Sequence, residues 1–213
     1  INFNKLMVSY IFLQARMSSR RLPGKVLFKL KNKTVLEQAV SNLKKIRLKK
    51  KIIVLTSKNK SDNKIVQHCK KKKILVFRGS LKNVYKRYFD AIKKFKNNFF
   101  IRINGDSPLI DYKIIEKAIR IFKSNKFDIV TNCQKRTFPK GQSVEIIKSD
   151  VFIKNYKFVK NKRYKEHIFL YYYSNSNKFK IFKIKKRGNS KNINQSIDTF
   201  EDYIKIKNYY KKK

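Results

Sequence analysis

Short apolar runs that alternate with longer amphipathic stretches predict the fold of the first 130 residues. An apolar run from Met7 to Leu13 predicts a buried strand, and four further β-rich runs follow it. Between them, apolar side chains recur every three to four residues, which is the spacing of a helix with one buried face. Strands that alternate with helices in this way favour a parallel, doubly wound sheet. The four later strands are predicted at Ile52–Leu55, Ile74–Phe77, Phe99–Ile103 and Phe127–Val130.

Capping residues mark where the helices begin. Thr34 with Glu37 three residues later is a capping box, and single polar caps open three more helices. A second pair of capping residues frames a last helix that runs to Tyr210. The predicted caps are Thr34 with Glu37, Asp62, Ser80, Asp111, and Thr199 with Asp202.

The pattern after Val130 is less regular. Helices are predicted over Asp150–Val159 and Lys162–Tyr173, and the short strands that accompany them predict a small antiparallel extension of the sheet. No internal repeat or linker divides the chain, so we expect a single domain over residues 1–213, with a short polar lead from Ile1 to Lys5. The late strands are predicted at Val144–Ile147, Phe179–Ile184 and Ile193–Ile197.

Composition points to a folded protein inside the cell. The chain has 213 residues, of which 41% are hydrophobic, so it can bury a real core. No apolar run is long enough to span a bilayer. The segment Lys5–Leu13 is as short as a signal sequence, but it lacks a cleavage site and runs directly into a basic loop. We therefore expect a cytoplasmic protein, no membrane partner, and reduced structural thiols at Cys69 and Cys133.

The charge of the chain is strongly positive. Lys and Arg number 56 against 13 Asp and Glu, which gives a formal net charge of +43. Such a charge is typical of nucleic-acid-binding proteins, but those concentrate it on one face. Here the lysines are spread over every predicted helix and loop, together with many Asn, Ile, Tyr and Phe residues. We interpret the charge as compositional bias and expect no specific nucleic-acid partner, with a basic nucleic-acid binder as one alternative function.

The stretch Gln14–Lys25 carries the first candidate chemistry. It leaves the end of the first predicted strand, and Pro23-Gly24 predicts a turn within it. Small side chains at Ser18 and Ser19 let backbone N–H groups approach a ligand. Fixed cations and free N–H donors at a strand end suit a polyphosphate. The cations are Arg16, Arg20, Arg21 and Lys25.

This loop resembles Ala-Arg-x-x-Ser-x-Arg-Leu-Pro-Gly-Lys of the sugar-acid cytidylyltransferases, which include the acylneuraminate and 3-deoxy-manno-octulosonate enzymes and a spore-coat polysaccharide branch. In that family the loop holds the triphosphate of CTP. Two positions depart from the pattern: Ser18 stands where Gly is usual, and Arg20 where a small residue is usual. The matching residues are Ala15, Arg16, Ser19, Arg21, Leu22, Pro23, Gly24 and Lys25.

Two carboxylates lie in further blocks that resemble the family. Asp106 follows a predicted strand in Gly-Asp-x-Pro-Leu-Ile, a block that includes Arg102. Asp198 lies in Ser-Ile-Asp-Thr-Phe-Glu-Asp, where Phe200 replaces the usual Pro. The resemblance implies that Asp106 and Asp198 together hold Mg²⁺. By itself, an Asp in the position of Asp106 is more often a turn residue or cap, and Asp198 with Thr199 could simply cap the last helix.

Three weaker blocks resemble the family with one substitution each. Asn83 replaces an Asp in the block that begins at Arg78. Ser143 replaces an Asp beside Glu145, and Lys165 replaces an Arg before Glu166-His167. The resemblance implies sugar contacts for Glu145 and His167, while a lone His on an aromatic helix is as often structural.

The resemblance implies a Rossmann-like, GT-A-like nucleotidyltransferase fold and the transfer of CMP from CTP to a sugar acid, with release of pyrophosphate, for surface polysaccharide or glycan synthesis. It implies a homodimer, whose contact we expect at 138–147. A glycosyltransferase-like enzyme that uses a nucleotide sugar is a second alternative. The predicted catalytic residues are Arg16, Lys25, Asp106 and Asp198. The predicted nucleotide contacts are Ala15, Arg16, Ser19, Arg21, Lys25, Thr56, Ser57, Arg102 and Asp106.

Overall fold

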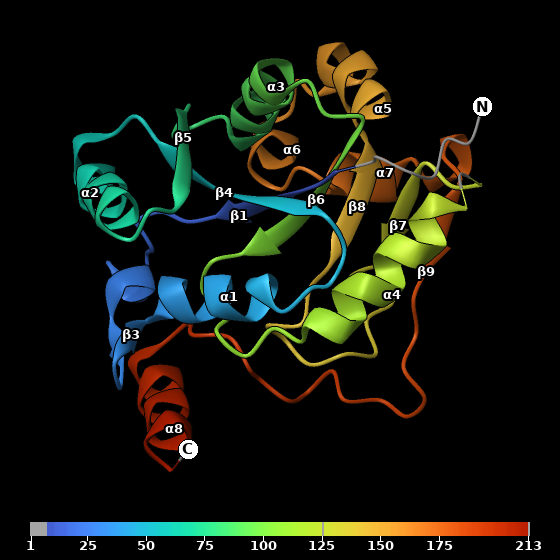
Figure 1. The fold of residues 1–213 in the computed structure, drawn as a ribbon. Coiled ribbons are helices and arrows are strands. Elements are labelled where there is room, and N and C mark those ends of the chain that lie inside the picture. Colours follow the sequence, from blue (N-terminus) through green and yellow to red (C-terminus); the bar gives the residue numbers. More distant parts are fainter. Residues whose placement is uncertain (1–7, 125, 213) are drawn as a thin grey trace.

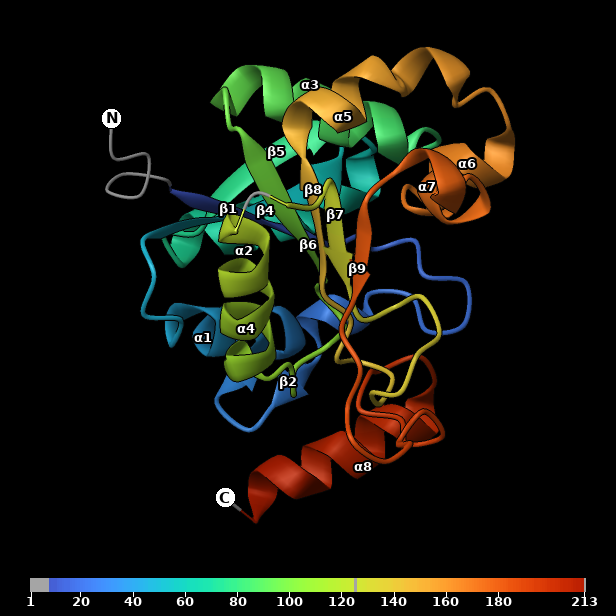
Figure 2. The same cartoon turned by 90° about the vertical axis from the view of Figure 1, so that its right-hand side faces the viewer.

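A seven-stranded sheet between two layers of helices forms the centre of the computed structural model, which describes residues 8–124 and 126–212 (Figures 1 and 2). Strand β1 (Ser9–Gln14) lies between β4 (Lys50–Ser57) and β6 (Phe99–Asn104), and β5 (Leu75–Gly79) lies outside β4. All four strands are parallel, as the alternating pattern predicts. Their carboxyl ends therefore meet along one edge, where ligands of such sheets bind.

The other side of the sheet contains one reversed strand. Strand β8 (Glu145–Lys148) pairs antiparallel with β6 and with β7 (Ile129–Thr131). Strand β9 (Ile181–Lys183) then pairs parallel with β7 at the edge. The result is a mostly parallel, Rossmann-like sheet with the order β5-β4-β1-β6-β8-β7-β9. A separate antiparallel pair joins β2 (Lys29–Leu30) to β3 (Lys33–Thr34).

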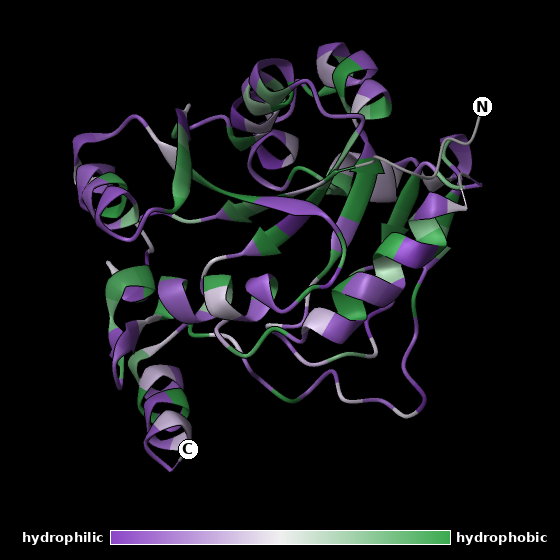
Figure 3. Cartoon of the chain, viewed as in Figure 1, coloured by the Kyte–Doolittle hydropathy of each residue, from purple (hydrophilic) through white to green (hydrophobic). Residues whose placement is uncertain are grey.

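Two hydrophobic clusters cover the faces of the sheet, and apolar residues concentrate there (Figure 3). Because side chains alternate along a strand, Ile11 and Leu13 of β1 face one cluster and Phe12 faces the other. Helices α1 (Val35–Lys44), α2 (Asn63–Lys71) and α4 (Tyr112–Lys123) pack on the first face. The second is covered by α3 (Val84–Phe95), α5 (Ser149–Lys154) and α7 (Leu170–Ser174), with α6 (Lys162–Glu166) beside α3, while α8 (Phe200–Lys211) packs near β2.

Most predicted caps are present. Thr34 and Thr199 form complete capping boxes, and Asp111 accepts a hydrogen bond from Lys113 N. The prediction for Ser80 is wrong, because α3 begins three residues later with Asn83 as its cap. Asp62 opens α2 as predicted and holds its N-cap position, but its carboxylate makes no capping bond and lies inside the protein.

Both helices predicted after residue 148 are shorter than expected. The first ends at Lys154 and continues as a 3₁₀ turn, Tyr156–Phe158. The second breaks at His167, whose φ of −103° and ψ of 81° leave the helical region. Phe169 and Tyr172 pack in the aromatic cluster around Phe152. Burial of these rings outweighs the helical spacing that the sequence displays.

The strand predicted at Ile193–Ile197 does not form. The segment runs under the sheet edge and is held by single backbone contacts: a bridge to Lys140, and a hydrogen bond of 2.9 Å from Ile197 N to Asp106 O. It packs so closely on Gly141 that a Cβ there would lie 2.5 Å from the Gln195 backbone. This segment therefore delivers Asp198 to the sheet edge without being a strand.

Two further predictions concern the N-terminal lead and membrane spans. The polar lead Ile1–Lys5 and Met7 lie outside the described residues. Within residues 8–124 and 126–212, no helix is long and apolar enough to cross a membrane.

Candidate active site

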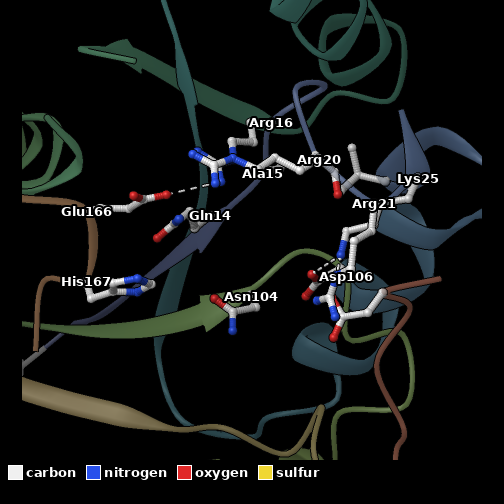
Figure 4. A pocket seen from close by; sticks show the side chains of 13 residues that line it. Gln14, Ala15, Arg16, Arg20, Arg21, Lys25, Asn104, Asp106, Glu166 and His167 are labelled. Carbon is white, nitrogen blue, oxygen red and sulfur yellow. Dashed lines mark hydrogen bonds and ion pairs between the residues drawn. The ribbon is translucent and has the colours of Figure 1, made fainter. Parts of the chain in front are cut away.

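A cavity of about 400 Å³ opens at the carboxyl ends of β1 and β6 (Figure 4). The basic loop forms one side, and Glu166 and His167 face it from the opposite side. Most predicted site residues meet here, although they come from positions 14 to 198. The lining consists of Gln14, Ala15, Arg16, Ser19, Arg20, Arg21, Lys25, Val26, Asn104, Asp106, Glu166, His167 and Asp198.

The basic loop has a closed neck. Gly24 N donates to Met17 O over 2.9 Å, so residues 17–24 form a compact loop above the end of β1. Gly24 has a φ of 76°, a left-handed conformation that favours glycine and confirms the predicted turn. The chain then enters a 3₁₀ turn, Lys25–Leu27, which points the Lys25 side chain inward. The loop thus places its arginines at the exposed rim of the cavity and one nearly buried lysine at its inner side.

Lys25 joins the two candidate carboxylates. Its Nζ lies 2.6 Å from Asp106 Oδ2 and 2.9 Å from Asp198 Oδ1, and it donates to Ile197 O over 2.6 Å. Since both contacts share Nζ, the two carboxylate oxygens are at most about 5.5 Å apart. The structure therefore brings together Asp106 and Asp198, which are 92 positions apart in the chain.

The environment of Asp198 keeps it ionised. Partial burial pushes the pKa of Asp198 up, but the hydrogen bond from Lys25 and the charges of Lys25, Arg21 and Lys140 together lower it below its usual value. Arg21 lies 3.0 Å from the same oxygen, Oδ1. Thr199, not Asp198, caps α8. The Asp198 carboxylate is thus available to the cavity, and the alternative of a helix cap applies only to its neighbour.

The paired carboxylates fit a divalent cation. Lys25 Nζ already places one positive charge between them, and each side chain keeps about a quarter of its surface exposed to the cavity. No cluster of three or more His, Cys, Asp or Glu side chains suited to a metal occurs among the described residues. Two carboxylates suit Mg²⁺, which usually completes its shell with water and substrate phosphates.

Other predicted contacts lie around the same cavity. Arg16 forms an ion pair of 3.4 Å with Glu166, which connects the loop to α6 across the cavity mouth (Figure 4). Both partners are more than one-third exposed, so this pair adds little to stability. Ala15, Ser19 and His167 also line the cavity.

Four predicted site residues do not line it. Thr56 and Ser57 are fully buried at the end of β4. Arg102 of β6 forms an ion pair with its cross-strand partner Glu145, which also accepts a hydrogen bond of 2.6 Å from Tyr173 Oη. Burial opposes the charge of Arg102, but Glu145 outweighs it and raises the Arg102 pKa. This pair is connected to the cavity through Gln14, whose Oε1 accepts a hydrogen bond from Arg102 Nε over 3.3 Å.

Asp62 is a site residue that sequence reasoning missed. Its fully buried carboxylate accepts a hydrogen bond of 2.7 Å from Met17 N and one of 2.9 Å from Ser57 N, and it contacts Ser57 Oγ. Asp62 therefore ties the neck of the basic loop to the end of β4. Its position before a helical pattern is typical of a cap, and no local signal shows that it reaches a loop 45 residues earlier.

A parallel sheet edge with a basic loop, a buried lysine and two carboxylates is the arrangement expected of a nucleotidyltransferase. The cytidylyltransferase family model matches residues 10–212, and the chain belongs to this family. This agrees with the family that the loop motif predicts and sets aside the glycosyltransferase alternative.

Three similar proteins support this assignment. A cytidylyltransferase structure from Leptospira borgpetersenii is 34% identical with a TM-score of 0.91, over 95% of this chain and 86% of that one. The spore coat polysaccharide biosynthesis protein SpsF of Bacillus subtilis is 28% identical, over 94% of this chain and 85% of its own. The structure of CMP:2-keto-3-deoxy-manno-octonic acid synthetase in complex with CTP is 14% identical with a TM-score of 0.75, over 96% and 99%, and shows the same fold.

Proposed function

We propose that this protein transfers CMP from CTP to a hydroxyl group of a sugar acid and releases pyrophosphate. One observation carries the proposal: Lys25 of the basic loop contacts both Asp106 and Asp198. The polyphosphate side and the carboxylate side are thus one site. Membership of the cytidylyltransferase family supports cytidine as the nucleoside, and the similarity to SpsF supports a product used in polysaccharide synthesis.

The residues of the loop account for binding and for charge in the transition state. Arg16, Arg20 and Arg21 present guanidinium groups to the cavity, where they suit the β- and γ-phosphates. The acceptor oxygen forms a bond to the α-phosphorus while the bond to the pyrophosphate oxygen breaks, and the hydroxyl proton is released. Lys25 balances the negative charge that grows on the leaving group.

Asp106 and Asp198 would hold Mg²⁺, and that ion would supply Lewis-acid stabilisation of the phosphate charge. The Asp62 carboxylate, which bonds to both Met17 N and Ser57 N, acts as a clamp on the loop. Because the clamp keeps the loop in place, its cations do not need to reorganise during the reaction. The chain needs no covalent nucleophile for this transfer.

Three finer parts of the proposal remain predictions. We propose a sugar contact for His167, which lines the cavity, whereas Glu145 is already paired with Arg102. We propose a cytoplasmic homodimer with a contact at 138–147. Within this segment Gln142 and Val144 are covered by their own chain, so a second copy would reach only other parts of 138–147.

The test is pyrophosphate release from each of the four nucleoside triphosphates against a panel of sugar acids with Mg²⁺. We expect turnover with CTP and one class of acid, and no turnover when Lys25 is replaced by Met. Equal rates with all four triphosphates, or no release with any acid, would contradict the proposed function.

A further inference from the structure

A second cavity lies directly beside the first. It measures about 310 Å³, within the size range of small-molecule sites, and shares Asn104, Asp106 and Asp198 with the first cavity. The two aspartates therefore form a wall between two compartments, and the basic loop borders only one. The second cavity is lined by Asn104, Asp106, Ser107, Arg136, Lys140, Gly141, Ser143, Ser196 and Asp198.

The far side of this second cavity is positively charged. Arg136 and Lys140 form no ion pair with any residue in 8–124 or 126–212, whereas Asp106 is paired with Lys25 and Asp198 is paired with both Lys25 and Arg21. Ser143 stands at the position where the family motif has Asp, so this chain lacks the carboxylate that would neutralise Arg136. The cavity keeps two positive charges opposite the aspartates.

Arg136 is held in place, but not all of its N–H donors are used. One terminal nitrogen donates to Ser143 Oγ over 3.0 Å, and the other lies 3.4 Å from Pro139 O. A guanidinium has five N–H donors, so several stay available for a ligand. The backbone under it is fixed, because Gly141 at φ 88° packs against Gln195 and Lys140 N donates to Ile193 O over 2.9 Å. A fixed, half-buried arginine suits a planar carboxylate better than a mobile surface lysine does.

We propose that Arg136 and Lys140 bind the acid group of the acceptor. This inference rests on the proposed function: an in-line displacement needs the attacking oxygen and the leaving pyrophosphate on opposite sides of the α-phosphorus. The basic loop takes the pyrophosphate side, and the second cavity lies across the aspartate wall from it. An acceptor with its carboxylate on Arg136 places its hydroxyl groups toward Asp106 and Asp198. Arg136 is thus the residue that selects an acid over a neutral sugar.

The first test measures binding without turnover. The probes are N-acetylneuraminate and 3-deoxy-manno-octulosonate, each compared with its methyl ester by ligand-observed NMR or calorimetry. The wild type should bind at least one acid about 10- to 100-fold more tightly than its ester, the usual range for a charge-assisted hydrogen bond. Arg136→Ala should remove this preference, and Arg136→Lys should restore only part of it. Equal binding of acid and ester by the wild type would overturn the proposal.

The second test uses kinetics to separate the acceptor from the nucleotide. Arg136→Ala should raise KM for the acid about 10- to 100-fold and leave KM for CTP within about twofold. A rise in KM for CTP alone would assign the cavity to nucleotide phosphate and overturn the proposal. The matched control is Arg187→Ala, which removes one exposed arginine outside both cavities and should change neither constant.

The outcomes also distinguish this inference from the proposed function. If CTP-dependent turnover is found but Arg136→Ala leaves KM for the acid unchanged, the inference fails and the function stands. If acid-selective binding depends on Arg136 but no triphosphate is consumed, the site stands and the function fails.

Discussion

Replacement of Lys25 by Met tests the charge arrangement on which the site depends. Methionine keeps an apolar stem of similar length but removes the cation between Asp106 and Asp198. Two unit charges at most about 5.5 Å apart repel by at least about 3 kcal/mol at an effective dielectric constant of about 20. The partial exposure of both carboxylates and the nearby Arg21 weaken this repulsion. Loss of the hydrogen bond from Lys25 to Ile197 O destabilises the variant further. We expect the free energy of unfolding to fall by about 2–4 kcal/mol near pH 7.

The loss should depend on pH in a defined direction. Burial raises the pKa of Asp198, but Lys25 and its cationic neighbours lower it further than burial raises it, so the net shift is downward. A carboxyl group with a lowered folded-state pKa stabilises the fold above its unfolded pKa of about 3.9, and that stability is lost as pH falls. The difference between wild type and Lys25→Met should therefore be largest near neutral pH and narrow below about pH 4.

Urea unfolding at pH 7 and at pH 3.5 measures this difference, and added Mg²⁺ at pH 7 should stabilise the variant more than the wild type. Lys185→Met is the matched control, since Lys185 is exposed and forms no ion pair in the described part of the chain. Equal destabilisation of Lys25→Met at both pH values would refute the reasoning, because a packing defect does not titrate.

The remaining predictions concern the metal, the loop and the net charge. Asp106→Asn and Asp198→Asn should each lower kcat on the order of 100-fold or more. The melting temperature should fall only modestly, because the remaining carboxylate still pairs with Lys25. Wild-type kcat in either variant would remove that residue from the mechanism. Asp62→Ala should raise KM for CTP about tenfold, because it loosens the neck of the basic loop. Ser57→Ala keeps the hydrogen bond from Met17 N to Asp62 and should raise KM less. A larger effect of Ser57→Ala would contradict the role of Asp62 as a clamp. Binding to duplex DNA should be weak and should disappear near physiological salt, so sequence-selective binding at that salt would mean that the charge serves nucleic acid.

The sequence predicts the first half of the fold well because its signals are local. Each parallel strand is an apolar run, and residues such as Thr34 and Asp111 cap helices through bonds to their own neighbours. The loop Gln14–Lys25 is equally local, and its glycine adopts the expected positive φ. Hydrophobic periodicity and capping residues are sufficient to predict an element whose conformation is determined by its own segment.

The second half depends on contacts that no local pattern records. The break at His167 follows from burial of Phe169 and Tyr172. Asp198 is positioned by contacts of its segment with Lys140 and by the hydrogen bond from Ile197 N to Asp106 O. Asp62 lies at the start of a helix, a position typical of a cap, but its carboxylate accepts a hydrogen bond from Met17 N. Each of these residues is placed by a partner that is distant in the sequence, and the physical reason becomes visible only when the chain is folded.

The segment that carries Asp198 also sets an order of events during synthesis. The ribosome has produced the four parallel strands, Lys25 and Asp106 well before it reaches Asp198, because Lys25 and Ile197 are separated by 172 positions. Protein chains fold from the N-terminus as they emerge, so the sheet can assemble around a half-built site. A fragment that stops before residue 190 would retain β1, β4, β5 and β6 yet lack the second carboxylate. We therefore expect that nascent and prematurely terminated chains lack a complete site and do not consume CTP.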